Sequence, residues 1–222
     1  IIKHSTIEEI ALMADDFIQE AENDPEEEPA NVVTFKMDLE AAFLLLTFFK
    51  EHVKWQCTRI TDDLLVYFLC GTFGWGGTPM AFQIITRTLV WELLNNEKWG
   101  FRGRVLMYVD DLMGICYRKD WEHNMGVIKA LCESLLGKGC ISDSKTEVGR
   151  RIDVIGYTLD LDQRRIGVAR HNILKALYVS MRVDVDKPVA IHTMEAMAAH
   201  ASRYKAVCPP LAPFARALHR SY

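Results

Sequence analysis

Two adjacent carboxylates, Asp110 and Asp111, stand between two apolar runs in the segment LMYVDDLMG, residues 106–114. The runs GRVLMYV and LMGICYR on either side read as two strands, so the segment predicts a β-hairpin with acids at its bend. Aspartate is an ordinary turn residue. Tight two-residue hairpins nevertheless favour Asn-Gly or Asp-Gly, because both central positions adopt positive φ. The acidic pair therefore indicates a role beyond turn formation.

A third carboxylate, Asp38, ends the apolar run NVVTFKMD at residues 31–38. A charge at the tip of a buried strand is unfavourable unless it is paired or bound to a cation. If this strand lies beside the 106–114 hairpin, three carboxylates converge, and their mutual repulsion requires positive charge nearby. Mg²⁺ suits such a site, since it prefers oxygen ligands and binds through a few carboxylates plus substrate phosphates. Taken alone, Asp38 is explained equally well as the N-cap of a helix starting at LEAAF.

The rest of the chain predicts an α+β fold, in which an antiparallel sheet is backed by helices and followed by a small helical segment. Ser5 and Glu8 fit a capping box for a first helix that runs to about Glu22. Further helices are predicted at residues 41–52 (a helix or a helical turn), 78–94, 119–137, 170–181 and 191–204, with one helical turn in the tail. Two more hairpins are predicted at residues 54–70 and 154–169.

Composition narrows the class of protein. The apolar run at residues 41–49 is shorter than the roughly 20 residues that a membrane-spanning helix needs, so no membrane partner is expected. Six cysteines without a C-x-x-C pair predict buried, reduced thiols and an intracellular, reducing location. The first residue is not Met, and we expect the sequence to be part of a longer protein.

Charge is distributed unevenly along the chain. The net charge of −4 by itself argues against binding to nucleic acid. Residues 162–222, however, contain ten lysines and arginines against four acids, a net charge of +6 that leaves −10 for the first 161 residues. Such asymmetry can mark polyanion binding, and an ordinary solvated face explains it equally well from charge alone.

Five segments together resemble the palm of a reverse transcriptase. Residues 38–43 (DLEAAF) resemble the first palm motif, an Asp followed five residues later by an aromatic residue. Residues 73–83 (FGWGGTPMAFQ) are similar to the second motif, F-G-x-x-x-[ST]-P-x-x-F, and residues 108–111 (YVDD) to the Y-x-D-D box. Residues 144–146 (SKT) resemble the lysine-bearing motif, and residues 154–157 (VIGY) the primer-grip hairpin. The ordered set is a stronger signal than a lone YVDD.

The resemblance implies a nucleotidyltransferase from a retrotransposon-like element, which adds dNTPs to a primer 3′-hydroxyl on an RNA or DNA template by two-metal-ion catalysis. It implies two Mg²⁺ ions, with Mn²⁺ as a substitute. The implied metal ligands are Asp38, Asp110 and Asp111, and Lys145 is the implied proton donor to pyrophosphate. Because neighbours on a strand point to opposite faces, direct ligation by Asp111 depends on the turn geometry.

The resemblance also assigns residues to the substrates. Phe43 matches the family's steric gate, whose ring leaves no room for a ribose 2′-hydroxyl. The implied nucleotide-binding residues are Leu39, Phe43, Phe73, Gly74, Gln83 and Tyr108, and those for template and primer are Pro79, Gly156 and Tyr157. Each also has an ordinary explanation alone: Phe43 fits a core, residues 73–79 a tight loop, Lys145 a solvated lysine, and Tyr157 strand packing.

The implied domains are an N-terminal helix and acidic loop at 1–30, a palm at 31–161, and the end of the primer-grip hairpin with a partial thumb at 162–222. No basic fingers region is recognisable before Asp38, so fingers, RNase H or other polyprotein domains are expected elsewhere. The alternative is a truncated or retired polymerase domain that binds nucleic acid or protein. An RNA-dependent RNA polymerase is a further alternative, although Phe43 and the Y-x-D-D box point away from it.

Overall fold

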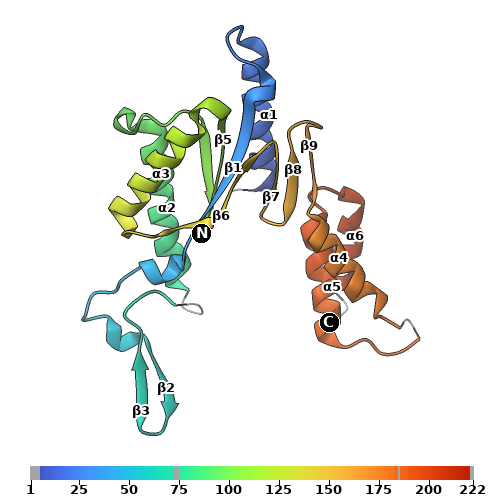
Figure 1. Cartoon of the computed structure of the whole chain (residues 1–222). Coiled ribbons are helices and arrows are strands. Elements are labelled where there is room, and N and C mark those ends of the chain that lie inside the picture. Colours follow the sequence, from blue (N-terminus) through green and yellow to red (C-terminus); the bar gives the residue numbers. More distant parts are fainter. Residues whose placement is uncertain (1–5, 73–75, 185, 221–222) are drawn as a thin grey trace. The chain divides into compact units, whose positions relative to one another are not determined.

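The structure is a computed structural model of the chain that describes residues 6–72, 76–184 and 186–220. These residues form two compact units, coloured along the sequence in Figure 1. The first unit comprises the described residues of Asp16–Gly149, and the second comprises Thr6–Asp15 with the described residues from Arg150 onward. Helix α1 (Ile7–Asn23) contributes residues to both.

A capping box starts helix α1 one residue later than predicted. The N–H of Thr6 donates to the Glu9 carboxylate at 2.9 Å, and the N–H of Glu9 donates to Thr6 Oγ1 at 3.2 Å. The prediction of a box formed by Ser5 and Glu8 is therefore wrong by one position, and Ser5 lies outside the described residues. The sequence STIEE permits both pairings, since Ser and Thr are both good N-caps.

The first unit is built on a four-stranded antiparallel sheet in the order β4-β5-β1-β6. Its strands are β1 (Val32–Leu39), β4 (Arg104–Tyr108), β5 (Asp111–Tyr117) and β6 (Ile141–Gly149). The predicted hairpin is confirmed as β4 and β5. The expectation that residues 31–38 lie beside it is also confirmed, because β1 pairs with β5 from Val32 to Asp38.

Helices α2 (Gly77–Asn95) and α3 (Trp121–Leu136) pack on the sheet and share one hydrophobic core with it (Figure 1). Both helices match the predicted ranges within two residues. Alternate residues of β1, from Val33 to Leu39, are buried in this core, as expected for one face of a strand. Asp38 lies between Met37 and Leu39, so it belongs to the opposite face.

Gly114 of β5 allows the sheet and the core to approach closely. A Cβ atom at this position would lie 2.3 Å from the Phe35 ring and 2.6 Å from the Arg104 carbonyl oxygen. Phe35 is fully buried and lies directly opposite Gly114 in the ladder. The absence of a side chain at Gly114 therefore leaves room for the ring of Phe35, the largest side chain of β1.

The segment between β1 and α2 is less regular than predicted. Of the two alternatives predicted for residues 41–52, a helix or a helical turn, the structure has the turn: a 3₁₀ turn spans Ala42–Leu45, because Ala41 adopts the left-handed conformation and Leu46 is extended. The predicted hairpin at 54–70 is confirmed as β2 (Cys57–Thr61) and β3 (Leu64–Tyr67), with nearly all its residues exposed. It forms a separate two-stranded sheet.

The described residues of the second unit from Arg150 onward form a three-stranded antiparallel meander followed by helices, and the first part of α1 belongs to the same unit. The strands are β7 (Arg151–Val154), β8 (Tyr157–Asp160) and β9 (Arg165–Val168), and the helices are α4 (Arg170–Met181), α5 (Ile191–Tyr204) and α6 (Ala212–His219). Both predicted helix ranges, 170–181 and 191–204, are confirmed. The predicted hairpin at 154–169 is extended by β7, and the tail forms two helical turns rather than one.

The cysteines differ in burial. Cys116, Cys132 and Cys140 are buried, and burial raises the pKa of Cys132 to about 12, so this thiol stays protonated at neutral pH. Cys57 and Cys208 are exposed, so the prediction of buried thiols is wrong for these two.

Within the described part of the chain, no helix has both the length and the apolar character needed to cross a membrane.

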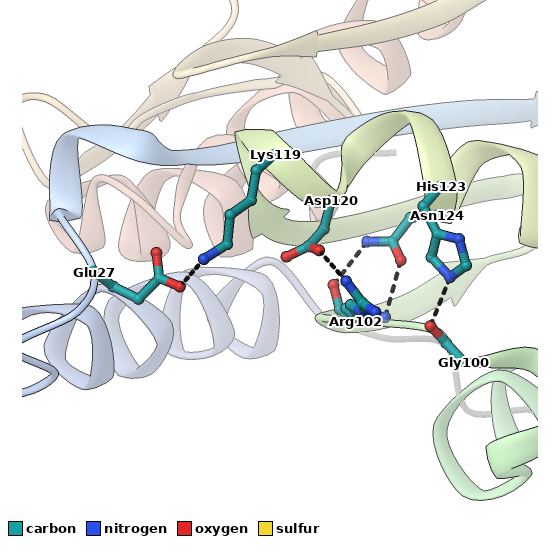
Figure 2. Close-up of polar contacts among 7 residues, drawn as sticks. All are labelled: Glu27, Gly100, Arg102, Lys119, Asp120, His123 and Asn124. Atoms are coloured by element: carbon teal, nitrogen blue, oxygen red, sulfur yellow. Dashed lines mark hydrogen bonds and ion pairs between the residues drawn. The ribbon is translucent and has the colours of Figure 1, made fainter.

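The loop between α2 and β4 is fastened to α3 by a group of hydrogen bonds (Figure 2). Asn124, which is fully buried, accepts from the N–H of Arg102 at 2.9 Å and donates to its carbonyl oxygen at 2.7 Å. The Arg102 guanidinium donates to Asp120 at 3.1 Å, and a ring nitrogen of His123 lies 2.8 Å from the Gly100 carbonyl oxygen. Because β4 begins two residues later, these contacts set the position of the hairpin.

Substitution Asn124→Ala is expected to lower the free energy of unfolding by about 2 kcal/mol, because it leaves two partly buried backbone groups of Arg102 without their partner. Chemical denaturation measures the change. Asn95→Ala is the control, since this exposed side chain at the end of α2 bonds only within its own helix. It should change stability by less than about 0.5 kcal/mol. Equal losses in both variants would contradict the role of Asn124.

Candidate active site

Strand pairing brings the first and third sequence motifs together. Asp38 of β1 lies directly opposite Asp111 of β5, and the N–H of Leu39 donates to the carbonyl oxygen of Asp110 at 3.0 Å. Directly opposed residues of antiparallel strands have Cβ atoms about 4.5–5.5 Å apart. The first helical turn after β1 is preceded by Ala41, not by Asp38. The helix-cap explanation of Asp38 is therefore wrong.

The bend between β4 and β5 consists of Val109 and Asp110. Tyr108 pairs with Asp111, so Asp111 is the first residue of β5 rather than part of the bend. Of the two bend residues, only Val109 has a positive φ, at 55°. This is the pattern of a type II′ turn, which favours glycine at that position. A β-branched residue is strained there, and such strain concentrates at functional sites.

The three carboxylates lie close enough to influence one another, and Lys145 bonds to one of them. Burial raises the pKa of Asp110, and the negative charge of Asp38 raises it further. Burial, followed by the charges of Asp110 and Asp38, raises the pKa of Asp111. Lys145 donates to Asp38 Oδ2 at 2.8 Å, and this hydrogen bond raises the pKa of the lysine. The positive charge of Lys145 therefore offsets part of the negative charge of the three carboxylates.

Oxygen donors of the kind that Mg²⁺ prefers lie near the end of β1 and in the bend between β4 and β5. Among residues 6–72, 76–184 and 186–220, no three or more His, Cys, Asp or Glu side chains are grouped so that they could hold a metal ion. Mg²⁺, however, retains water and is usually held by only one or two carboxylates together with substrate phosphates. Asp38 and Asp110 provide oxygen donors of that kind, so the residues fit the ion, and the predicted pair of metals stays a prediction.

The predicted nucleotide-binding residues lie in several elements. Phe43 is half-buried, and its ring meets that of Phe82 edge-on, with centroids 5.6 Å apart and an interplanar angle of 82°. The side chain of Leu39 is buried in the core, while its N–H bonds to the 109–110 bend. Gln83 of α2 and Tyr108 of β4 are partly buried. Phe73 and Gly74 lie outside the described residues.

The predicted template and primer residues fall in both units. Pro79 is in the first turn of α2 in the first unit. Gly156 and Tyr157 belong to the second unit, where Ile155 and Gly156 both have positive φ, as in a type I′ hairpin turn. Tyr157 is buried and its hydroxyl donates to the Arg203 carbonyl oxygen at 2.5 Å, so its side chain packs within this unit.

Known proteins resemble this chain in structure but not detectably in sequence. No protein-family model and no curated protein matches it. A foamy viral protease–reverse transcriptase, solved in complex with an RNA/DNA hybrid, superposes with a TM-score of 0.58 at 14% sequence identity, over 83% of this chain. The telomerase of Candida albicans, solved in complex with a fragment of telomeric RNA, gives a TM-score of 0.57 at 11% identity, over 96% of this chain. The chain has a reverse transcriptase-like fold.

The similarity is one of fold, and it covers part of each neighbour. The chain spans 24% of the foamy viral protein and 44% of the telomerase. The same fold is shared with a second foamy viral structure, in complex with double-stranded DNA, at a TM-score of 0.57 and 13% identity over 81% of this chain. The reverse transcriptase-like fold is therefore supported by proteins of two kinds.

One charged residue near the acids was not predicted from the sequence. Lys36 lies on the same face of β1 as Asp38, bonds to Glu147 at 3.1 Å, and its charge lowers the pKa of Asp111. The alternation of a strand could have found it, since residues two apart share a face. In this reverse transcriptase-like fold, lysines from two strands thus accompany the acids.

Proposed function

We propose that this chain is the catalytic part of a reverse transcriptase, which adds deoxynucleotides to a primer 3′-hydroxyl on an RNA or DNA template. The observation that supports it most is the placement of Asp38 opposite Asp111, beside the bend that carries Asp110, at one end of the sheet. Burial and the charge of Asp38 raise the pKa of Asp110, and burial with the charges of Asp110 and Asp38 raises the pKa of Asp111. A scaffold has no use for such an acidic cluster. A retired domain kept only for binding is therefore not favoured.

The roles follow from where the side chains lie. Asp38 and Asp110 would hold Mg²⁺, with Asp111 as the third candidate ligand. When bound, the ions would activate the primer hydroxyl and neutralise charge on the transferred phosphate. The acids themselves are positioned by the β1–β5 ladder, so they need little rearrangement to bind a cation. Lys145 would supply a proton to the leaving pyrophosphate from its place beside Asp38.

A primed template is the proposed partner. The foamy viral neighbours are complexes with an RNA/DNA hybrid and with double-stranded DNA, and the telomerase neighbour is a complex with telomeric RNA. Contacts to the phosphate backbone would dominate binding, so affinity would fall steeply as salt increases. The basic residues after Asp162 are the proposed source of those contacts. A retroelement origin is part of the same proposal.

Primer extension by the purified chain tests this function. Primed RNA and DNA templates are incubated with dNTPs or NTPs, in Mg²⁺ or Mn²⁺, and the products are sized. We expect template-dependent incorporation of dNTPs that requires a divalent cation. Preferential use of NTPs would favour an RNA polymerase instead, and no extension under any of these conditions would overturn the proposal for this chain.

Phe43→Ala is expected to raise ribonucleotide incorporation relative to deoxynucleotide incorporation by about tenfold, because the ring would no longer exclude the 2′-hydroxyl. Competition between an rNTP and the matching dNTP measures the ratio. The edge-on contact with Phe82 supports a fixed ring position in the wild-type protein. Phe49→Ala is the control, since Phe49 is 77% exposed in the same segment. Unchanged sugar discrimination in an active Phe43→Ala variant would reject the steric role.

A further inference from the structure

Strand β6 leaves the sheet ladder just where Lys145 occurs. The β1–β6 register runs from Thr34 opposite Gly149 to Lys36 opposite Glu147, and it resumes with Asp38 opposite Ser142. Residues 143–146 therefore form a bulge beside β1. Such bulges redirect side chains and are common next to active sites.

Local hydrogen bonds give the bulge a defined shape. Thr146 Oγ1 donates to the carbonyl oxygen of Ser142 at 3.2 Å, and the hydroxyls of Ser142 and Ser144 lie 3.3 Å apart. Lys145 stands between these bonded residues. The bulge is thus a short closed segment that presents one long cationic side chain to the end of β1.

The ammonium of Lys145 forms an ion pair with a carboxylate oxygen of Asp38, which is a proposed metal ligand. Its Nζ lies 2.8 Å from Asp38 Oδ2. The side chain of Asp38 is only 16% exposed, whereas that of Lys145 is 57% exposed. The carboxylate is therefore the fixed member of the pair, and the lysine is the member that can move into solvent.

We propose that Lys145 is a placeholder cation, which neutralises Asp38 in the metal-free protein and is displaced when a divalent cation binds. This inference rests on the proposed function, because it takes Asp38 as a metal ligand. Two cations close to one carboxylate oxygen repel each other, so the ion pair and the metal compete for Asp38. The ion pair thus raises the metal concentration that binding requires, and it reduces the repulsion among the acids in the metal-free protein.

Removing the ammonium has two effects of opposite sign. Without metal, the carboxylates lose their nearest counter-charge, so the variant Lys145→Met should melt several degrees lower than the wild type in chelator. With metal, Asp38 is free, so Mn²⁺ should bind about tenfold more tightly, a difference of about 1.4 kcal/mol. Mn²⁺ should then raise the melting temperature of the variant more than that of the wild type, as ligand linkage requires.

Titration of the whole chain with Mn²⁺ alone, followed by electron paramagnetic resonance of the free ion, tests the proposal without any polymerase reaction. Lys145→Arg keeps the positive charge and should retain the wild-type affinity within about threefold. Lys138→Met is the matched control, because Lys138 is an exposed lysine in the turn that follows α3 and lies outside the 143–146 bulge. In the double variant Lys145→Met with Asp38→Asn, the gain in affinity should disappear.

The outcomes separate the two proposals. Tighter Mn²⁺ binding by Lys145→Met alone supports the placeholder role. Equal or weaker binding by Lys145→Met, with measurable binding by the wild type, overturns the placeholder role and leaves the metal site standing. No Mn²⁺ binding by the wild type or by any variant overturns both the placeholder role and the proposed metal site.

Discussion

Substitution of Asp110 by asparagine is expected to lower the rate of primer extension by about a thousandfold, with little effect on folding. The side chain keeps its shape but loses the charge that would hold a metal and oppose charge on the transferred phosphate. The contact that joins the bend to β1 uses the carbonyl oxygen of Asp110, and the variant retains it. Single-turnover extension at saturating dNTP measures the loss directly.

Asp62→Asn is the matched control for this prediction. Its carboxylate is fully exposed at the turn between β2 and β3, where it lies 4.0 Å from the Arg59 guanidinium. The same change of charge should therefore leave the extension rate within about twofold. An Asp110→Asn variant that folds and extends primers at the wild-type rate would remove the acids from the proposed mechanism.

The second large effect concerns stability: Gly114→Ala is expected to lower the free energy of unfolding by about 3 kcal/mol, as overpacking of a dense core does. The added methyl group would meet the Phe35 ring at 2.3 Å and the Arg104 carbonyl oxygen at 2.6 Å. The backbone of β4 cannot move away without breaking its ladder with β5. Thermal unfolding should show a fall in melting temperature of roughly 6–12 °C.

Gly126→Ala provides a control in which the same chemical change should have the opposite effect on stability. Gly126 lies inside α3, and a Cβ atom there would have no neighbour within 4 Å. Alanine stabilises a helix interior by about 1 kcal/mol relative to glycine. The control should therefore melt at a higher temperature than the wild type. If both melting temperatures shift in the same direction, the close packing of Gly114 against Phe35 does not explain the loss of stability.

The sequence predicted the parts of the fold that depend on periodicity and on local punctuation. Helix α4 follows a strand run and α5 has amphipathic spacing, and both have the predicted ranges. The apolar run at residues 31–38 and the 106–114 hairpin were expected to be neighbours, and the β1–β5 ladder confirms it. In each case several neighbouring residues favoured the same secondary structure, and the tertiary contacts favoured it too.

The parts that were missed depend on contacts between distant segments. Strand β6 contains SDSKTE, which has no apolar alternation, and it is a strand because β1 offers a free edge. The bulge around Lys145 exists only relative to the register of β1. The bend position was misjudged as well, since the strained residue is Val109 and the second acid belongs to β5. Tertiary pairing decided each of these.

The 143–146 bulge separates two tasks that a regular strand would combine. Residues before and after it keep β6 on the sheet, while the segment between them can lengthen or shorten without shifting the register of β1. Evolution or design could therefore adjust how far the ammonium reaches, and so how readily the acids accept an ion, through insertions that leave the hydrophobic core untouched. Under the proposed placeholder role, the metal affinity would then vary with the length of the 143–146 segment.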